Sequence, residues 1–372
     1  MTIADLATAL DELPLIDHHV HGALAAELDR PAMERALTES DRPIPGWMTQ
    51  FDSQLGVALR RWCAPVLDLP PRVAPEEYLR RRHELGAAEV TRRLLRAAGV
   101  AHWLVDTGMG GTELLSPAEM AEISATRADE VVRLESVLEQ LGRDDVAAGE
   151  LPERFAQVLA ERSARAVGLK SVVAYRHGFD FDPHRPSRAE VVAAAGRWLR
   201  AGGGRVDDPV LLRFLLWSGV DLGLPLQLHA GHGDPDLRLH RCDPLLLTEF
   251  VELVEPAPLV LLHCYPFHRN AGHLAQVYPH VFFDVGLAVN HTGARSAAVV
   301  AESLELAPFA KVLFSSDACG PAELHHLGAV LWRRGTHRAL AEWVQEGVWS
   351  EDDAVRIAGM IGAGNARRLY DC

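Results

Sequence analysis

Short apolar runs that end in polar residues recur along this chain, and longer segments with helical periodicity lie between them. Eight such runs occur, at residues 13–19, 101–107, 129–134, 167–174, 225–230, 259–264, 281–285 and 312–316. Strands that alternate with helices are typical of a parallel sheet, because each parallel neighbour is reached through a crossover. The pattern predicts an α/β fold, a (β/α)8 TIM-type barrel, with an open doubly wound sheet as the alternative.

The stretch between the first two runs is much longer than one crossover helix requires. Residues 23–98 hold Trp47, Trp62 and a basic cluster at 80–82. We interpret 23–98 as a helical insertion, or lid, that covers the mouth of the barrel.

The acidic balance of the chain restricts its partners. It has 51 acidic and 37 basic residues among 372, which gives a formal net charge of -14. Such a surface repels the phosphates of nucleic acids and anionic lipid heads, so neither nucleic acid nor membrane is expected as a partner. The five cysteines form no CxxC pair, and the start of the chain lacks a signal-peptide pattern. We expect reduced thiols and a cytoplasmic location.

The end of the first run carries the strongest chemical signal. The segment LIDHHVHG at 15–22 places His19 and His21 two residues apart. Strand side chains alternate between faces, so both imidazoles are expected on one face, as two ligands of one metal ion must be. Asp17 is expected on the same face, beneath the ligands, and His18 on the opposite face.

Three other runs end in the same manner. His229, His263 and Asp317 follow the segments LQL, VLL and FSS. The carboxyl ends of barrel strands meet at one mouth, and burying several imidazoles and a carboxylate there without a cation is costly. Together these residues predict a metal site.

Taken in order, these elements resemble the amidohydrolase superfamily, of the amidohydrolase family 2 type. Four stretches are similar to the amidohydrolase domains found fused to glutamine synthetase: GLKSVVAYR at 168–176, DLRL at 236–239, HCYPF at 263–267 and SSDA at 315–318. The resemblance runs from about Asp17 to the C-terminus and is weakest in 23–98. We expect residues 1–372 to form a single metal-dependent hydrolase barrel.

The resemblance implies a divalent metal ion held by His19, His21, His229 and Asp317. Zinc is the first expectation, and manganese, iron and cobalt also accept such nitrogen and oxygen ligands. The metal-activated water is the nucleophile, with Asp317 as general base and then general acid. His263 is expected to polarise the substrate carbonyl.

Lys170 leaves the number of metals open. In binuclear relatives a lysine of the fourth strand is carboxylated and bridges two ions, and His263 then binds the second ion. Counted from the start of its run, Lys170 is level with His229 and His263, but the apolar run continues to Ala174 and can place it deeper. We favour one metal, with Lys170 as a buried cation paired within the barrel, for example with Asp17.

Cationic side chains near the predicted mouth indicate an anionic small-molecule substrate. Arg133, Arg176 and Arg238 are candidates to clamp a carboxylate, and Tyr175 is a candidate to hydrogen bond it. Glu323, which follows the eighth run, is a candidate to hold a substrate amine.

The resulting hypothesis is the hydrolysis of C–N (amide) bonds in a small carboxylate-bearing molecule, such as a γ-glutamyl or N-acyl amino-acid compound. A non-oxidative decarboxylase on the same barrel and a non-catalytic regulatory domain are the alternatives. A homo-oligomer stays open, because no sequence feature separates an interface from the exterior of a barrel.

Overall fold

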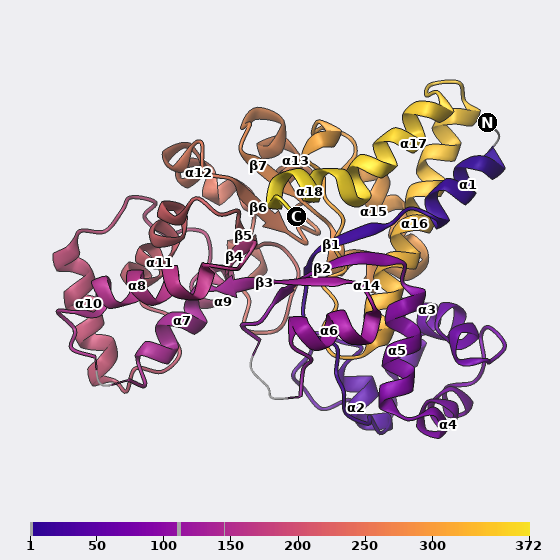
Figure 1. Ribbon diagram of the computed structural model, residues 1–372, viewed down its shortest axis with the longest axis horizontal. Helices are drawn as coiled ribbons and strands as arrows, with labels where there is room; N and C mark the ends of the chain where they lie inside the picture. The colour runs from indigo at the N-terminus through magenta and orange to yellow at the C-terminus, as the bar shows by residue number, and fades with distance from the viewer. Residues whose placement is uncertain (1–2, 110–112, 145) are drawn as a thin grey trace.

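A parallel sheet forms the centre of the molecule. The computed structural model describes residues 3–109, 113–144 and 146–372. Within these residues the sheet has seven strands: β1 (Leu15–Val20), β2 (Val100–Asp106), β3 (Arg127–Arg133), β4 (Gly168–Ser171), β5 (Leu226–His229), β6 (Leu259–Leu262) and β7 (Val281–Phe283). Each strand pairs in parallel with the next one along the chain. Figure 1 shows them in the middle of the ribbon.

The eighth predicted run, 312–316, does not form a regular strand but bonds to both edges of the sheet. The Leu313 N–H donates to the carbonyl of Phe283 in β7 at 3.0 Å. On the other side, the His18 N–H of β1 donates to the Phe314 carbonyl at 3.2 Å. The run therefore lies between β7 and β1, and the α/β arrangement is consistent with a TIM-type barrel.

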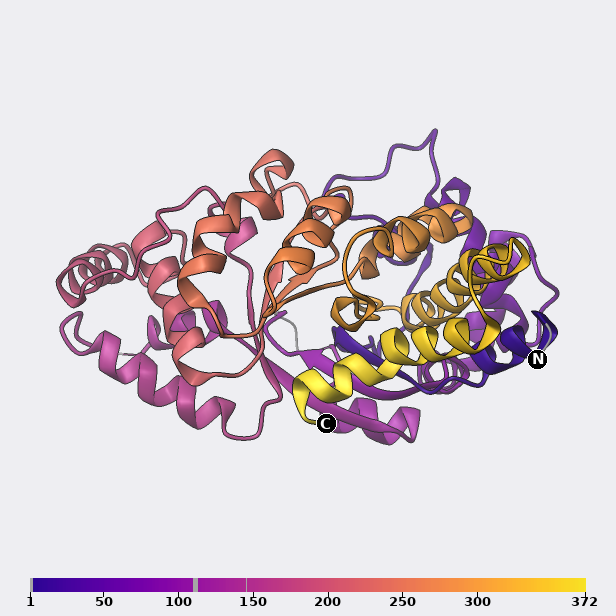
Figure 2. The same ribbon diagram turned by 90° about the horizontal axis from the view of Figure 1, so that it is seen from above.

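Helices occupy the connections and both ends of the chain. They are α1 (Ile3–Asp11), α2 (Arg30–Arg35), α3 (Gln54–Trp62), α4 (Pro75–Leu85), α5 (Ala87–Ala97), α6 (Pro117–Ser124), α7 (Leu134–Leu141), α8 (Leu151–Ser163), α9 (Val173–Arg176), α10 (Arg188–Arg200), α11 (Pro209–Leu222), α12 (Thr248–Val254), α13 (His268–Val277), α14 (Gly286–Thr292), α15 (Ser296–Ser303), α16 (Ala322–Gln345), α17 (Glu351–Gly359) and α18 (Asn365–Tyr370). Figures 1 and 2 show α8 and α10 at one end of the molecule and α1, α16 and α17 at the other. In the part of the chain that the structure describes, no helix is both long enough and apolar enough to cross a bilayer.

Helix starts follow capping signals in the sequence. Before α10, the Ser187 hydroxyl accepts from the Glu190 N–H at 3.3 Å, and the Glu190 carboxylate accepts from the Ser187 N–H at 2.8 Å. Before α11, the Asp208 carboxylate accepts from the Val210 N–H at 2.9 Å. The capping box thus fixes the start of α10.

A small apolar cluster fills the space that the curled sheet encloses. Four strands and α18 contribute to it, with Ile16, Leu104, Val131, Val260, Leu262 and Tyr370. Each of these residues is at most 4% exposed. Because the interior is packed with side chains, a ligand can reach the polar groups only at an end of the strands.

A buried ion pair attaches the 23–98 segment, which contains α2 to α5, to α16. Nε of Arg82 in α4 donates to Oε1 of Glu323 at 3.0 Å, and the Tyr78 hydroxyl donates to the same oxygen at 3.0 Å. Arg82 is 1% exposed and Glu323 is 0% exposed. Removing one partner would leave the other charge buried and unpaired, which is strongly destabilising.

We therefore expect Arg82→Met to lower the free energy of unfolding by roughly 3–5 kcal/mol, measured by urea denaturation. Arg81→Met is the matched control, because Arg81 pairs at 2.8 Å with Asp68, whose side chain is 61% exposed. The control should cost less than about 1 kcal/mol. Equal losses in the two variants would contradict the anchoring role of Arg82.

Candidate metal centre and substrate pocket

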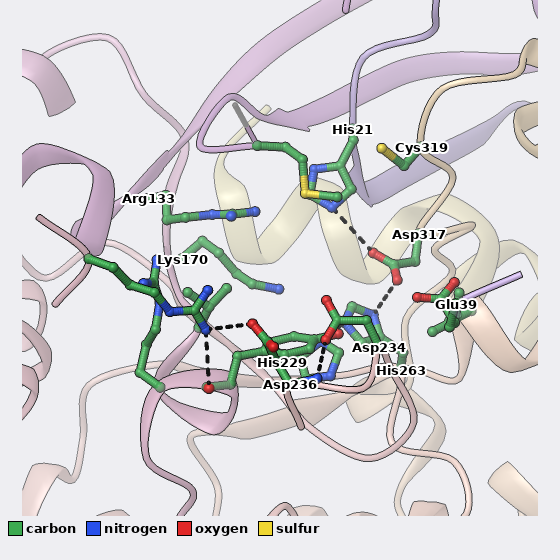
Figure 3. A pocket seen from close by; sticks show the side chains of 16 residues that line it. His21, Glu39, Arg133, Lys170, His229, Asp234, Asp236, His263, Asp317 and Cys319 are labelled. Atoms are coloured by element: carbon green, nitrogen blue, oxygen red, sulfur yellow. Dashed lines mark hydrogen bonds and ion pairs between the residues drawn. The ribbon is translucent and has the colours of Figure 1, made fainter. Parts of the chain in front are cut away.

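A pocket of about 260 Å³ opens at the carboxyl ends of the strands (Figure 3). It is lined by His21, Glu39, Met109, Arg133, Lys170, Val172, Tyr175, Arg176, Arg205, His229, Asp234, Asp236, His263, Leu287, Asp317 and Cys319. His19 is 0% exposed and does not reach this lining. The pocket thus gathers residues from distant parts of the chain, as the convergence of strand ends predicts.

The strand β1 departs from regular alternation just before the pocket. Its pairing with β2 is irregular after Asp17. His18 Nδ1 lies 3.1 Å from the Tyr370 hydroxyl, and that hydroxyl accepts from Nε2 of Gln227 at 2.9 Å. His19 Nδ1 lies 2.8 Å from Oε1 of the same Gln227. Two consecutive histidines therefore point into one interior network, and the prediction that His18 faces away was wrong.

The prediction that Asp17 lies beneath the metal ligands was also wrong. Its carboxylate accepts from the Ser316 N–H at 3.0 Å and from the Ser316 hydroxyl at 2.5 Å. Ser316 packs against Gly328 of α16, where an added Cβ would lie 2.4 Å from the Ser316 Cβ. Asp17 therefore faces the helix outside the sheet, because the irregularity of β1 ends the alternation on which the prediction rested.

Gln227 fixes the orientation of His19. Its amide nitrogen donates to the His18 carbonyl at 2.8 Å, and that carbonyl can only accept. The amide oxygen is consequently the atom that accepts from His19 Nδ1–H. His19 Nε2 is left without a proton, and it lies 3.1 Å from Oδ1 of Asp317 and 3.4 Å from Nζ of Lys170.

The other imidazoles surround the same carboxylate. His21 Nδ1 lies 3.3 Å from the Asp106 carbonyl, and His21 Nε2 lies 3.7 Å from Oδ1 of Asp317. His263 Nδ1 is 3.4 Å from Oδ2 of Asp317, and His263 Nε2 is 2.8 Å from His229 Nδ1. His229 Nε2 is buried and has no hydrogen-bond partner among the described residues. The nitrogen atoms that face the pocket are therefore available as ligands.

The electrostatics of this cluster suit a cation. Burial holds the pKa of His19, His229 and His263 well below the usual value, so these imidazoles are neutral. Burial also raises the pKa of the Asp317 carboxyl, although His21 and Lys170 oppose that shift. Neutral imidazoles cannot balance a buried carboxylate, whereas a divalent metal ion can.

Two groups of potential ligands are present within the described residues, and their ligand atoms lie within 4.8 Å of one another: His19, His263 and Asp317, and His19, His21 and Asp106. The structure thus brings together the predicted ligands His19, His21 and Asp317. The fourth, His229, belongs to neither group and contacts the cluster through His263. Together with the unpartnered His229 Nε2, the donor set fits a divalent metal ion.

Two residues of the cluster have an unusual backbone conformation. His263 has φ 44° and Asp317 has φ 49°, both in the left-handed region. The Asp284 carboxylate accepts from the His263 N–H at 3.0 Å, and the His19 carbonyl accepts from the Asp317 N–H at 3.2 Å. Such conformations cost free energy and concentrate at functional sites, where surrounding contacts maintain them.

Lys170 is 2% exposed, and its backbone is level with Gln227 instead of His229. The strand β4 ends at Ser171, and Lys170 is paired with Gln227, two residues before the end of β5. Its Nζ reaches the pocket beside His19, and it does not pair with Asp17. Burial lowers the pKa of its ammonium group, while Asp106 and Asp317 oppose that shift.

Sequence reasoning missed Gln227, Asp106 and Asp284 around the candidate metal centre, and Glu39, Arg205, Asp234 and Asp236 in the pocket lining. Asp106 ends β2 and accepts from Nη2 of Arg133 at 2.6 Å. Asp284 follows β7 and lies 3.1 Å from His18 Nε2. Asp106 and Asp284 could have been predicted by the same pattern that indicated His263, because each is an ionisable residue at the end of an apolar run.

Three of the five predicted substrate-binding residues line the pocket, and two do not. Tyr175, Arg176 and Arg133 line the pocket. Arg238 is exposed on a loop outside the lining, and Glu323 points away to Arg82 in a fully buried pair. The structure therefore separates Arg238 and Glu323 from the pocket in which they were predicted.

A parallel α/β sheet with histidines and aspartates gathered at its strand ends defines a metal-dependent enzyme. The chain belongs to the amidohydrolase family, whose model matches residues 16–372.

Relatives agree with this assignment. The chain is 28% identical over 307 residues to the protein fluG of Emericella nidulans, a match that covers 78% of this chain and 33% of the fungal protein. The chain thus spans about a third of the length of that curated relative.

Solved structures share the fold. A protein from Lactobacillus casei described as a metal-dependent hydrolase has a TM-score of 0.86 and 25% identity, and the match covers 98% of this chain and 97% of that one. A uronate isomerase from Bacillus halodurans has a TM-score of 0.68 and 13% identity, with 99% and 96% covered. The second likeness shows the fold alone, whereas the family and the first neighbour imply a divalent metal.

Removing the histidine pair tests the metal centre. We expect wild-type protein to retain a divalent metal and His19→Asn/His21→Asn to lose it, because two neutral nitrogen ligands disappear. Metal content is measured by inductively coupled plasma mass spectrometry. The control is His240→Asn, an exposed histidine outside the lining. Retention of metal by the double variant would contradict the assignment.

Gln227→Leu tests whether the Gln227 amide orients His19 for metal binding. We expect a metal affinity about 10- to 100-fold weaker, because the imidazole loses the acceptor that holds its tautomer. Tyr370→Phe is the graded comparison, since it removes only the hydroxyl that contacts Gln227 and His18. Competition with a fluorescent chelator measures both. An unchanged affinity in Gln227→Leu would show that the amide has no role in binding.

Proposed function

We propose that this chain is a metal-dependent hydrolase of C–N (amide) bonds in a small substrate that carries a carboxylate. Membership of the amidohydrolase family supports the reaction class. The observation that carries the proposal is the position of Asp317, whose Oδ1 faces His19 and His21 while its Oδ2 faces His263. One carboxylate thus links the candidate ligands to a group that can act on the substrate.

We assign the metal to His19, His21, His229 and Asp317, with zinc as the first expectation and one ion per chain. A bound divalent ion supplies Lewis acidity to a carbonyl and makes a water molecule more acidic. Asp317 accepts a proton from the attacking water and transfers it to the departing amine nitrogen. His263 is held against His229 through Nε2, and its Nδ1 stabilises negative charge that develops on the carbonyl oxygen.

Cationic side chains in the pocket support an anionic group on the substrate. Arg133, Lys170, Arg176 and Arg205 line the pocket, together with the acidic residues Glu39, Asp234, Asp236 and Asp317. Guanidinium groups bind carboxylates in a planar, bidentate manner. We assign Arg176 and Tyr175 to the substrate carboxylate. Arg133 donates from both Nε and Nη2 to Asp106, whereas Arg176 has a single ion pair, from Nη2 to Glu139 at 3.1 Å.

We also assign the 23–98 segment to a cover over the mouth. Glu39, which belongs to it, lines the pocket, and its carboxylate lies 3.3 Å from Nε2 of His291 in α14. A cover of this kind excludes water and strengthens electrostatic contacts with the substrate.

Asp317→Asn tests the mechanism. We expect kcat for amide hydrolysis to fall about 10²- to 10⁴-fold, because asparagine cannot accept the proton, and asparagine tolerates the left-handed backbone. Released amine is measured with a panel of γ-glutamyl and N-acyl amino-acid amides, and metal content is measured alongside. Asp371→Asn is the matched control, an aspartate with φ 50° outside the pocket lining.

The same assay separates the alternatives. Carbon dioxide released without amine would identify a decarboxylase. Metal-loaded protein without turnover of any kind would favour a non-catalytic domain. Wild-type activity in Asp317→Asn would exclude Asp317 as the group that transfers the proton.

A further inference from the structure

The Asp284 carboxylate is buried where four segments of the fold meet. Asp284 follows β7 and is 0% exposed. Its Oδ1 accepts from the Gly286 N–H at 2.7 Å and from the Ser315 hydroxyl at 2.7 Å, in addition to the His263 N–H. Its Oδ2 lies 3.1 Å from Nε2 of His18. One carboxylate therefore contacts β1, the residues that follow β6 and β7, and the eighth run.

Three of the contacts of this carboxylate adjoin the candidate metal centre. His18 directly precedes the ligand His19. Ser315 lies two residues before Asp317, and a third contact is the backbone of His263 itself. His263 has φ 44°, a conformation that persists only where surrounding contacts maintain it. The carboxylate supplies one such contact and also holds the two segments that carry His19 and Asp317.

The directions of the interior hydrogen bonds follow from the orientation of Gln227. Its amide nitrogen donates to the Tyr370 hydroxyl, whose hydrogen-bond partners among the described residues are Gln227 and His18. The acceptor for the Tyr370 O–H is therefore Nδ1 of His18, which carries no proton. The proton of a neutral His18 is then on Nε2, where it is donated to Oδ2 of Asp284. In this arrangement each of these buried donors has an acceptor.

We propose that Asp284 is a positioning residue of the metal centre, whose carboxylate fixes the proton of His18 on Nε2 and holds the backbone of His263. Because His19 follows His18 in the chain, the same contact restrains a predicted metal ligand. Asp284 is outside the pocket lining, so it acts through the residues that it holds. This positioning role rests on the metal centre of the proposed function and not on its amide substrate.

Asp284→Asn reverses the polarity of one atom and tests the role directly. The asparagine oxygen still accepts from the three donors that face Oδ1, but the amide nitrogen donates toward His18. We expect the proton of His18 to move from Nε2 to Nδ1, because Nε2 must now accept. Long-range proton–nitrogen NMR spectra of metal-free, histidine-labelled protein distinguish a protonated ring nitrogen from an unprotonated one.

Tyr370→Phe separates the effect of the carboxylate from a general disturbance of the network. The carboxylate of Asp284 remains in this variant, so His18 should keep its proton on Nε2. In wild type and in both variants, His19 should keep its proton on Nδ1, because the His18 carbonyl still orients Gln227. The His19 signal therefore reports that the interior of the fold is intact.

Metal affinity tests the consequence for the centre. We expect Asp284→Asn to bind zinc about 10- to 100-fold more weakly than wild type, as for other groups that orient metal ligands. Competition with a fluorescent chelator measures the affinity. Asp129→Asn is the matched control, because Asp129 also lies against a histidine, 2.7 Å from Nε2 of His102, but is outside the pocket lining. Its zinc affinity should equal that of wild type.

The two measurements fail in different ways. If wild type binds no zinc but the His18 proton moves in Asp284→Asn, the metal assignment of the proposed function fails and the control of His18 by Asp284 stands. A proton on Nδ1 of His18 in wild type or in Tyr370→Phe would overturn the positioning role, and this outcome decides even if Asp284→Asn does not fold. An unmoved proton or an undiminished zinc affinity in Asp284→Asn would overturn it as well.

Discussion

A buried imidazole can serve as a metal ligand only when its second nitrogen is held in place, and Gln227 does this for His19. The amide of Gln227 is itself oriented by the His18 carbonyl and the Tyr370 hydroxyl. The chain of contacts therefore starts in α18, the last helix, and ends at the first strand. The orientation of His19 affects both groups of candidate ligands, because His19 belongs to each of them.

Much of the architecture could be predicted from the sequence, because parallel strands are short apolar runs with polar ends. The same logic placed His21, His263 and Asp317 at one mouth. It did not place His18 or Asp17, because it assumed regular alternation, and the contact of His18 with Tyr370 joins residues 352 positions apart. Nor did it separate Glu323 from the pocket, since that depended on the burial of Arg82 in another helix.

The 23–98 segment contributes both a buried ion pair and a residue of the pocket lining. Its Arg82 pairs with Glu323 at the start of α16, a few residues after Asp317, while its Glu39 lines the pocket. The segment is thus attached to the same part of the chain that supplies Asp317, the carboxylate to which we assign proton transfer.

The irregularity in β1 has a consequence for how many chemical groups a barrel can offer. A regular strand contributes only every second side chain to the interior of a barrel. The number of polar side chains that can point inward is therefore limited by the number of strands. One irregular position lets His18 and His19 both enter, and each finds a different partner. A barrel can therefore enlarge its set of inward functional groups by deforming one strand instead of acquiring another.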